Sequence, residues 1–453
     1  MVTNKDHARI LLVGGGAREH AIGEALCRRQ KVNLFVVSHN YNPGLARLAC
    51  QFEKYKETDV KSITKWAKHH DVNLAVIGLE DPLDVGLPDA LADIGIPTVG
   101  PCRDAARVET SKLFTRDLMR KHGIPGQVEY HHFTEANSFR KFLLSSSRDY
   151  ALKPVGLTAG KGVKVMGEHF GSTEEAIAYG EKVIYEKIGG TSSLIVEERL
   201  FGEEFTLQTF VDGETILPMP LVQDFKRALE GDIGPNTGGM GSYSQPDGLL
   251  PFVTWKESGD ALEILRLVVR ALRAEGMRYQ GILYGQFIVT DRGIKLIEMN
   301  ARFGDPEAVN VLPLLENDFV DVCRAIVNGT LRHMDLRFAR KATVCKYITP
   351  PDYGFESKVG VPIKLDIPKI QSLGVRIFFA KVDQDRKKDV FVTTSSRSIA
   401  LVGIGDSVEE AEALVEQAIL HVSGDYYIRR DIAKKEMLQR KAFGKKTAVA
   451  AYR

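Results

Sequence analysis

The stretch that decides the fold of this chain is Glu298-Met299-Asn300-Ala301-Arg302-Phe303-Gly304-Asp305-Pro306-Glu307. Two apolar runs precede it, at residues 285–289 and 294–297, and this pattern predicts a β-hairpin. Because alternate residues of a strand share a face, Glu298 and Asn300 should point the same way. A carboxylate beside an amide oxygen suits Mg²⁺, which takes few protein ligands and keeps phosphate oxygens. The alternative is that these are ordinary solvated polar residues at the end of a strand. Motifs elsewhere in the chain are needed to distinguish the two interpretations.

Composition excludes several classes of protein. The chain has 453 residues, 44% hydrophobic and 26% charged, which is ordinary for a globular protein of three or four domains. A net charge of +2 gives no reason to expect nucleic acid or a membrane as partner. No apolar run reaches membrane-spanning length and no signal peptide is visible. The five cysteines lack metal-type spacing, and we expect reduced thiols in a cytoplasmic protein.

The N-terminal region alternates strands and helices. A buried-strand pattern at 8–13 leads through Gly14, Gly15 and Gly16 into a helix that should start near Glu19. Further strands at 34–37 and 74–77 flank a helix near 60–70. This order predicts a Rossmann-like parallel sheet, with ligands at the carboxyl ends of its strands. One such strand ends in a loop with Glu80, which lines a cleft or forms a solvated turn.

Three interpretations of the Gly14–Gly16 loop compete. Glycines between a strand and a helix favour phosphate binding, because the backbone can approach an anion at the helix N-terminus. A nicotinamide dinucleotide site is less favoured, since the G-x-G-x-x-G fingerprint is incomplete and the second strand ends at Ser38-His39 without an acidic residue. A plain tight turn is the third interpretation.

A second glycine-rich loop lies further along the chain. One helix is expected from Asp104 to His122, with Lys112 early on it, and a strand near 150–153 ends at Lys153. The loop from Gly156 to Gly162, which includes Gly160 and Lys161, should join this strand to another at 163–166. No helix follows, so it is not a Walker A loop. Such a loop can fold over phosphates as a flap, or it is a mobile hairpin.

The chain then supplies a linker that could hold a nucleotide base and ribose. A strand at 193–198 ends in Glu197 and Glu198, and Leu200 and Glu204 follow. Together with Lys112, Lys153, the second glycine loop and the Glu298-x-Asn300 pair, this order and spacing resemble the ATP-grasp superfamily.

Four short sequence blocks indicate which family within this superfamily the chain resembles. These are residues 14–21, residues 223–227, residues 231–241, which include Pro235-Asn236-Thr237-Gly238-Gly239, and residues 302–307. They are similar to the blocks of the phosphoribosylamine–glycine ligase (glycinamide ribonucleotide synthetase) family, and the resemblance runs from about residue 8 to residue 433. Gln286 stands where many ATP-grasp proteins carry an acidic metal ligand, so it is a weaker candidate ligand.

The resemblance implies a multidomain α/β and α+β architecture. A Rossmann-like domain at 1–105 precedes an ATP-grasp domain at 106–330, whose mobile flap lobe spans about 125–192. A small α+β domain at 331–435 follows. The basic tail at 436–453 is expected to be disordered.

The resemblance also implies a reaction. ATP, glycine and 5-phosphoribosylamine would give glycinamide ribonucleotide, ADP and phosphate in purine synthesis. Glycine would be activated as an acyl phosphate, with Mg²⁺ or Mn²⁺ on Glu298, Asn300 and Gln286. Arg302, Asp224 and Lys153 would be catalytic, Asp224 holding the glycine ammonium. ATP would be held by the residues Lys112, Lys153, Gly156, Gly160, Lys161, Gly162, Glu197, Leu200 and Glu204.

The substrate site implied by the resemblance is larger. Its members are Gly14, Gly15, Gly16, Glu19, Asp224, Lys226, Arg227, Pro235, Asn236, Thr237, Gly238, Gly239, Arg302, Gly304 and Asp305. Another ATP-grasp ligase and, from a different class, a nicotinamide oxidoreductase are the rival functions. We expect a monomer rather than a dimer.

Overall fold

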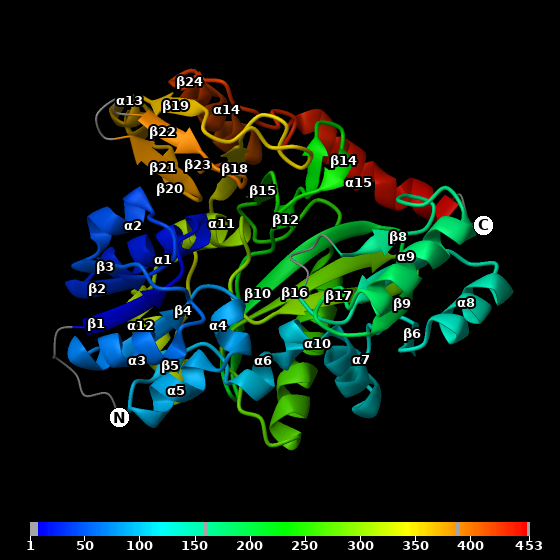
Figure 1. The fold of residues 1–453 in the computed structure, drawn as a ribbon. Helices are drawn as coiled ribbons and strands as arrows, with labels where there is room; N and C mark the ends of the chain where they lie inside the picture. The colour runs from blue at the N-terminus through cyan, green and yellow to red at the C-terminus, as the bar shows by residue number, and fades with distance from the viewer. Residues whose placement is uncertain (1–7, 158–161, 386–389, 451–453) are drawn as a thin grey trace.

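The computed structural model describes residues 8–157, 162–385 and 390–450, with no description of side chains at 443–450. Figure 1 shows three bodies around a central sheet. The N-terminal sheet lies on one side, the C-terminal domain above it, and the flap lobe on the other side. In the described part of the chain no helix is long and apolar enough to cross a membrane.

The N-terminal region forms the parallel sheet that its strand–helix alternation predicts. Its strands run in the order β3-β2-β1-β4-β5, and every pairing is parallel. The order reverses beside β1, so ligands are expected above the carboxyl ends of β1 and its neighbours. The elements are β1 (Ala8–Val13), α1 (Ala17–Cys27), β2 (Val32–Val37), α2 (Pro43–Leu48), β3 (Gln51–Glu53), α3 (Val60–His69), β4 (Leu74–Ile77), α4 (Asp81–Asp84), α5 (Leu87–Asp93) and β5 (Thr98–Val99).

The prediction of one continuous helix from Asp104 to His122 is wrong. The structure has two helices there, α6 (Arg103–Thr110) and α7 (Lys112–Lys121). Ser111 breaks it. Its backbone is extended, and its hydroxyl caps α7 by accepting from the Phe114 amide. The Lys112 amide donates to the Val155 carbonyl at 3.1 Å, so a contact with a distant residue replaces a helical bond.

The flap lobe is a separate packing unit. Its antiparallel sheet has the order β6-β9-β7-β8, and its apolar side chains form a core cluster apart from the two larger ones. The second glycine loop joins β7 to β8, as predicted, although residues 158–161 lie outside the described residues. The elements are β6 (Tyr130–Phe133), α8 (Ala136–Ser145), β7 (Tyr150–Pro154), β8 (Lys164–Val165), α9 (Thr173–Tyr185) and β9 (Leu194–Glu198).

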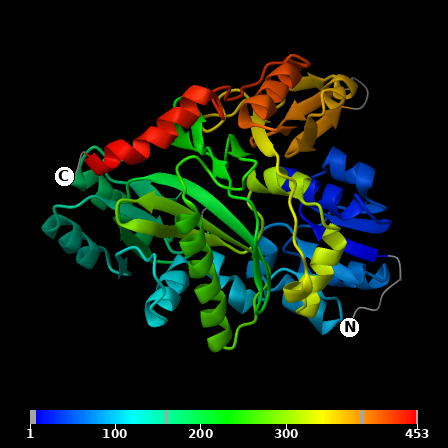
Figure 2. The same ribbon diagram turned by 180° about the vertical axis from the view of Figure 1, so that it is seen from behind.

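The central antiparallel sheet has the order β11-β10-β16-β17. The long helix α10 crosses its back in Figure 2, and α11 and α12 connect it to the N-terminal region. The elements are β10 (Glu203–Asp212), β11 (Ile216–Pro218), α10 (Trp255–Ala274), β16 (Gln280–Thr290), β17 (Gly293–Asn300), α11 (Glu307–Leu314) and α12 (Phe319–Asn328).

The C-terminal sheet takes in strands from the middle of the chain. Its order is β12-β15-β18-β23-β20, and β12 and β15 come from residues before 245. Between β12 and β15 in the chain, β13 and β14 form a separate two-stranded hairpin. A second sheet of the C-terminal domain has the order β21-β22-β19-β24. The elements are β12 (Gln223–Asp224), β13 (Arg227–Leu229), β14 (Ile233–Asn236), β15 (Gly241–Ser244), η1 (Leu331–His333), β18 (Ala342–Ile348), β19 (Pro362–Leu365), α13 (Ile367–Ser372), β20 (Arg376–Phe379), β21 (Val382–Asp385), β22 (Val390–Thr393), β23 (Ile399–Gly405), α14 (Val408–Ile419) and β24 (Val422–Gly424).

The expectation of a disordered tail at 436–453 is wrong for residues 436–450, and residues 451–453 lie outside the described residues. Residues 436–450 belong to helix α15 (Lys435–Ala450). Met437 and Leu438 are buried in the main core, 5% and 9% exposed. In both ribbon views the helix leaves the C-terminal domain and ends beside the flap lobe (Figures 1 and 2). Apolar anchors therefore order a segment whose basic composition alone predicts disorder.

A matched pair of glycines tests the packing of the C-terminal domain. Gly403 on β23 lies so close to α14 that a Cβ there would collide with the Ala411 carbonyl oxygen. Gly403→Ala should therefore lose about 2 kcal/mol or more. Gly259 is exposed on α10 with nothing near its Cβ position, so Gly259→Ala should gain up to about 1 kcal/mol. Thermal melting of both variants checks this, and a Gly403→Ala variant as stable as the native chain would contradict it.

Candidate active site

The hairpin of β16 and β17 places the predicted metal pair as expected. Glu298 pairs with Gln286 in the ladder and Asn300 with Tyr284, so Glu298 and Asn300 share one face of β17. Both side chains line two adjoining cavities, of about 120 and 600 Å³. Among the residues described, no three His, Cys, Asp or Glu side chains gather in a metal-binding cluster. One carboxylate and one amide is a donor set that fits a hydrated Mg²⁺ completed by phosphate oxygens.

Gln286 does not have the surroundings of a metal ligand. It is completely buried, its amide oxygen accepts a hydrogen bond from the Tyr284 hydroxyl, and its amide nitrogen donates to Glu204 at 2.8 Å. Unlike Asn300, Gln286 lines neither cavity, and both polar atoms of its side chain are bonded within the protein. Gln286 instead holds Glu204 toward the larger cavity.

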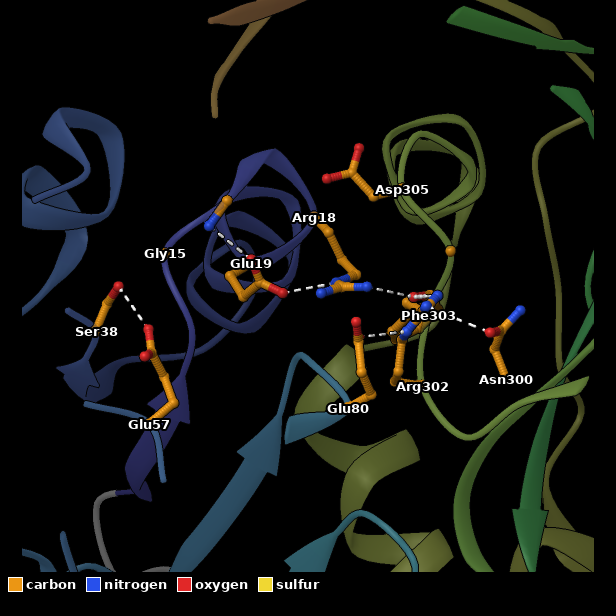
Figure 3. A network of polar contacts seen from close by, with 12 residues as sticks. Gly15, Arg18, Glu19, Ser38, Glu57, Glu80, Asn300, Arg302, Phe303 and Asp305 are labelled. Carbon is orange, nitrogen blue, oxygen red and sulfur yellow. Dashed lines mark hydrogen bonds and ion pairs between the residues drawn. The ribbon is translucent and has the colours of Figure 1, made fainter. Parts of the chain in front are cut away.

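Arg302 is held between two carboxylates from different regions. Its Nε donates to Glu80 at 3.1 Å, and its Nη2 lies 2.9 Å from Glu109 Oε1. A weaker contact, 3.3 Å, joins Nη2 to the amide oxygen of Asn300. Figure 3 shows Glu80 and Asn300 on opposite sides of this guanidinium. The loop of Glu80, for which the sequence leaves a cleft or a solvated turn open, therefore lines the smaller cavity.

Burial sets the charge states of this clamp. Burial raises the pKa of Glu109 to about 7, and the opposing pull of Arg302 does not cancel it. Burial alone would also raise the pKa of Glu80, but the positive charges of Arg302 and Arg18 lower it to about 2. The two carboxylates in turn raise the pKa of Arg302 despite its burial. The clamp therefore consists of the Arg302 cation, the ionised Glu80, and Glu109, whose carboxyl titrates near neutral pH.

The flap side of the cavity carries two lysines. Lys153 Nζ lies 2.5 Å from Glu197, whose other oxygen accepts from Arg116 Nε at 2.7 Å. Burial would raise the pKa of Glu197, but these two cations lower it to about 2. Lys112 donates to the Gly156 carbonyl at 3.1 Å. The result is a positive wall beside Glu298, fixed by a buried anion.

The opposite wall is a network around Asp224, whose side chain is buried, with the half-buried Lys226 and Glu204 beside it. Lys226 lies 3.0 Å from Glu204 and 3.8 Å from Asp224. Burial would lower the pKa of Lys226, yet these carboxylates raise it, so this lysine is charged. Burial raises the pKa of Asp224, and Glu204 adds to this against the pull of Lys226. Burial and the nearby Asp224 raise the pKa of Glu307 to about 7. A cavity wall with closely spaced carboxyls is suited to a small cation such as an ammonium group.

The first glycine loop is packed tightly against its own domain. The Gly16 amide donates to Glu19 Oε2 at 2.6 Å, and Glu19 Oε1 pairs with Arg18 Nε at 2.6 Å. Arg18 also donates to the Phe303 carbonyl at 3.0 Å, which joins this loop to the 302–307 stretch (Figure 3). A side chain on Gly15 would collide with Ser38 Oγ. The Gly16 amide is thus paired within the loop, and none of the three glycines lines either cavity.

The loop faces a second polar cluster, formed by Asp305, Tyr347 and Arg397. A Cβ on Gly16 would lie 3.7 Å from Asp305 Oδ2. Asp305 accepts from the Tyr347 hydroxyl at 2.5 Å and lies 3.0 Å from Arg397 Nη1. Arg397 also donates to the Gly239 carbonyl at 3.2 Å. Residues from the N-terminal, central and C-terminal regions therefore meet here.

Most of the predicted site residues reach the cavities. The members that line one or both are Lys112, Lys153, Glu197, Leu200, Glu204, Asp224, Lys226, Arg227, Asn236, Thr237, Gly238, Glu298, Asn300, Arg302, Gly304 and Asp305. Those that line neither are Gly14, Gly15, Gly16, Glu19, Gly156, Gly162, Pro235, Gly239 and Gln286. Gly160 and Lys161 lie outside the described residues.

Sequence patterns did not reveal several buried participants. Glu109, Arg116 and Arg397 lie on elements whose apolar spacing carries no sign of a site. Glu307 ends the stretch quoted first, and Tyr284 lies two residues before Gln286 on β16. Alternation along that strand is a signal that would have found Tyr284, because it puts Tyr284 on the same face as Gln286.

Comparison with known proteins agrees with this geometry. Family models of phosphoribosylglycinamide synthetase match the N domain over residues 8–109, the ATP-grasp (A) domain over 110–308 and the C domain over 343–435. The phosphoribosylamine–glycine ligase of Methanothermobacter thermautotrophicus is 48% identical over 433 residues, covering 96% of this chain and 98% of that protein. Its counterpart from Thermococcus gammatolerans is 47% identical over 442 residues, with the same coverage.

Solved structures extend the comparison. The phosphoribosylamine–glycine ligase of Thermotoga maritima superposes with a TM-score of 0.79 at 27% identity, covering 93% of this chain and 99% of that one. The biotin carboxylase domain of the Hydrogenobacter thermophilus 2-oxoglutarate carboxylase shares only the fold, with a TM-score of 0.74, 15% identity and 99% of each chain covered. The fold and the cavity between flap lobe and central sheet define an ATP-grasp protein. Within that class the chain belongs to the phosphoribosylglycinamide synthetase family.

Proposed function

We propose that this chain is a phosphoribosylamine–glycine ligase, which uses ATP to join glycine to 5-phosphoribosylamine in purine synthesis. Glycinamide ribonucleotide, ADP and phosphate are the products. The observation that carries the proposal is the pair of walls around Glu298 and Asn300. One wall is cationic, with Lys112 and Lys153, and the other has the carboxyls of Asp224 and Glu307. High-coverage relatives bear the same name.

ATP lies between the flap lobe and the central sheet. Lys153 and Lys112 are point charges for its phosphates, and Glu197 keeps Lys153 in place. The second glycine loop, of which residues 158–161 lie outside the described residues, is the segment that we assign to the phosphates. Leu200 and Glu204 line the larger cavity where the base and ribose are held.

Glu298 and Asn300 hold the divalent cation, Mg²⁺ or Mn²⁺. When bound there, the cation neutralises phosphate charge during phosphoryl transfer. Gln286 keeps Glu204 in position and leaves the cation to the two β17 residues.

Glycine must be activated, because a carboxylate is a poor electrophile. Transfer of the γ-phosphoryl group to its carboxylate gives glycyl phosphate and ADP, and the substrate amine then displaces phosphate. Arg302 neutralises charge at the transferring group while Glu80 and Glu109 hold its guanidinium. Asp224 binds the glycine ammonium. The flap excludes water, which would hydrolyse the acyl phosphate.

Phosphoribosylamine enters from the substrate end. Its 5′-phosphate rests on the outer side of the Gly14–Gly16 loop, at the N-terminus of α1. Glu19 fixes that loop through the Gly16 amide. The remaining contacts come from Lys226, Arg227, Gly304, Asp305 and the segment Pro235–Gly239.

The proposal is tested by phosphate release from ATP with glycine and freshly made phosphoribosylamine, against a panel of other acids and amines. We expect turnover that needs both substrates, and mass spectrometry should identify glycinamide ribonucleotide. Turnover with bicarbonate or another acid instead would make the chain a different ATP-grasp ligase. Binding of a nicotinamide dinucleotide without ATP turnover would favour the oxidoreductase. Sedimentation at assay concentration tests the expected monomer.

A further inference from the structure

Helix α15 begins where the match to the family's C domain ends, at residue 435. It leaves the C-terminal domain, passes beside the β13–β14 hairpin and ends near the flap lobe (Figure 1). The buried Met437 and Leu438 anchor its first turns. Of its described side chains, that of Lys441 lines the larger cavity.

Lys441 points from this helix into the wall of the larger cavity. Its Nζ lies 3.1 Å from Glu203 Oε2 and 3.0 Å from Asp232 Oδ2, and its side chain is only 18% exposed. Burial would lower the pKa of Lys441, but the two carboxylates raise it. A charged lysine thus bridges two anions that belong to different segments.

Asp232 is the turn of the β13–β14 hairpin and adopts a left-handed backbone, with φ of 61°. It also accepts an ion pair from Arg429 at 3.0 Å. Arg429 is completely buried, bonded to Asp431 at 2.7 Å and to the Arg227 carbonyl at 3.0 Å. The hairpin turn is therefore tied both to the C-terminal domain and to α15.

This hairpin carries part of the proposed substrate wall. Asn236, the last residue of β14, lines the larger cavity together with Thr237 and Gly238. The amide and the hydroxyl of Thr237 both donate to the Lys226 carbonyl. Glu203 directly precedes Glu204 on β10, and Glu204 pairs with Lys226 at 3.0 Å. Lys441 consequently links the nucleotide side of the cavity to its substrate side.

Resting on the proposed function, we propose that Lys441 is a positioning residue of the active site, delivered by the C-terminal helix. It fixes the β13–β14 hairpin relative to β10 and so sets the place of the segment Asn236–Gly238. It touches neither the phosphates nor the reacting atoms. Without it, Glu203 and Asp232 face each other across the cavity edge with no shared counter-ion.

The test is steady-state kinetics on the full chain with Lys441→Met, which keeps length and removes charge. We expect the KM for phosphoribosylamine to rise about tenfold, equivalent to about 1.4 kcal/mol, while kcat stays within about threefold. Lys441→Arg should return the KM to within about threefold of the native value. Lys435→Met, on an exposed position of the same helix, is the matched control and should change nothing.

A double-mutant cycle with Asp232→Asn separates positioning from general damage. Asp232→Asn also weakens the pair with Arg429, so its own KM need not equal that of Lys441→Met. If the Lys441–Asp232 link acts as a unit, Lys441→Met should add little to the KM change already caused by Asp232→Asn. An unchanged KM in Lys441→Met, or a loss confined to melting temperature, would overturn the proposal. Failure of the proposed function looks different, because the native chain itself would then not turn over these substrates.

Discussion

Glu298→Ala is expected to lower kcat by about a thousandfold or more, a loss of about 4 kcal/mol of transition-state stabilisation. Glu298 is the one carboxylate in the proposed metal pair, and it stands beside the cationic wall of Lys112. Alanine removes the anionic ligand and leaves the neutral amide of Asn300 alone. Binding of Mn²⁺ in the presence of ADP, followed by electron paramagnetic resonance, should weaken in parallel with turnover.

Gln286→Ala is the matched control on the paired strand. Its amide oxygen bonds Tyr284 and its nitrogen holds Glu204, so alanine should disturb nucleotide binding and leave Mn²⁺ affinity nearly native. The KM for ATP should therefore rise in this variant. Equal loss of Mn²⁺ binding in both variants would restore Gln286 to the metal site and contradict the assignment.

The sequence was sufficient for features that depend on local periodicity. Glu298 and Asn300 share a face because a strand has a period of two, whatever packs around it. The strand–loop–strand order around Gly156 likewise follows from apolar runs and the absence of a following helical pattern. These predictions needed no knowledge of distant contacts.

Features that depend on distant contacts could not be predicted. Nothing around Ser111 interrupts the helical apolar spacing, and the break arises where the Lys112 amide meets Val155. Glu109 becomes part of the site because Arg302, almost two hundred residues later, folds against it. Helix α15 is likewise held by distant contacts, since Lys441 pairs with Glu203 and Asp232 on other segments of the chain.

Arg302→Met is expected to affect both catalysis and stability. Turnover should fall by about a hundredfold to a thousandfold, because a group that neutralises charge at the transferring phosphoryl is lost. Stability should fall by about 3 kcal/mol near pH 8, since Glu80 and Glu109 keep their buried positions without the shared cation. Thermal melting and kinetics on the same preparation measure the two effects.

The loss of stability should depend on pH with a definite sign. Burial holds the pKa of Glu109 at about 7, above its ordinary value of 4.5, so between these values the folded state binds more protons than the unfolded state. Stability from this group therefore falls as pH rises from about 4.5 to 7. Without Arg302 the pKa of both carboxyls should rise further. The melting temperature of Arg302→Met should then decline more steeply with pH than that of the native chain.

The variant Arg302→Met with Glu109→Gln divides the two roles of Arg302. Glutamine removes a buried ionisable group while it can still accept from the Ala301 amide, which bonds Glu109 at 2.6 Å. The double variant should recover much of the stability lost near pH 8 and lose part of the pH slope. Its turnover should stay low, because no cation faces the phosphoryl group. If turnover recovered together with stability, Arg302 would act by holding the fold, and its catalytic assignment would be wrong.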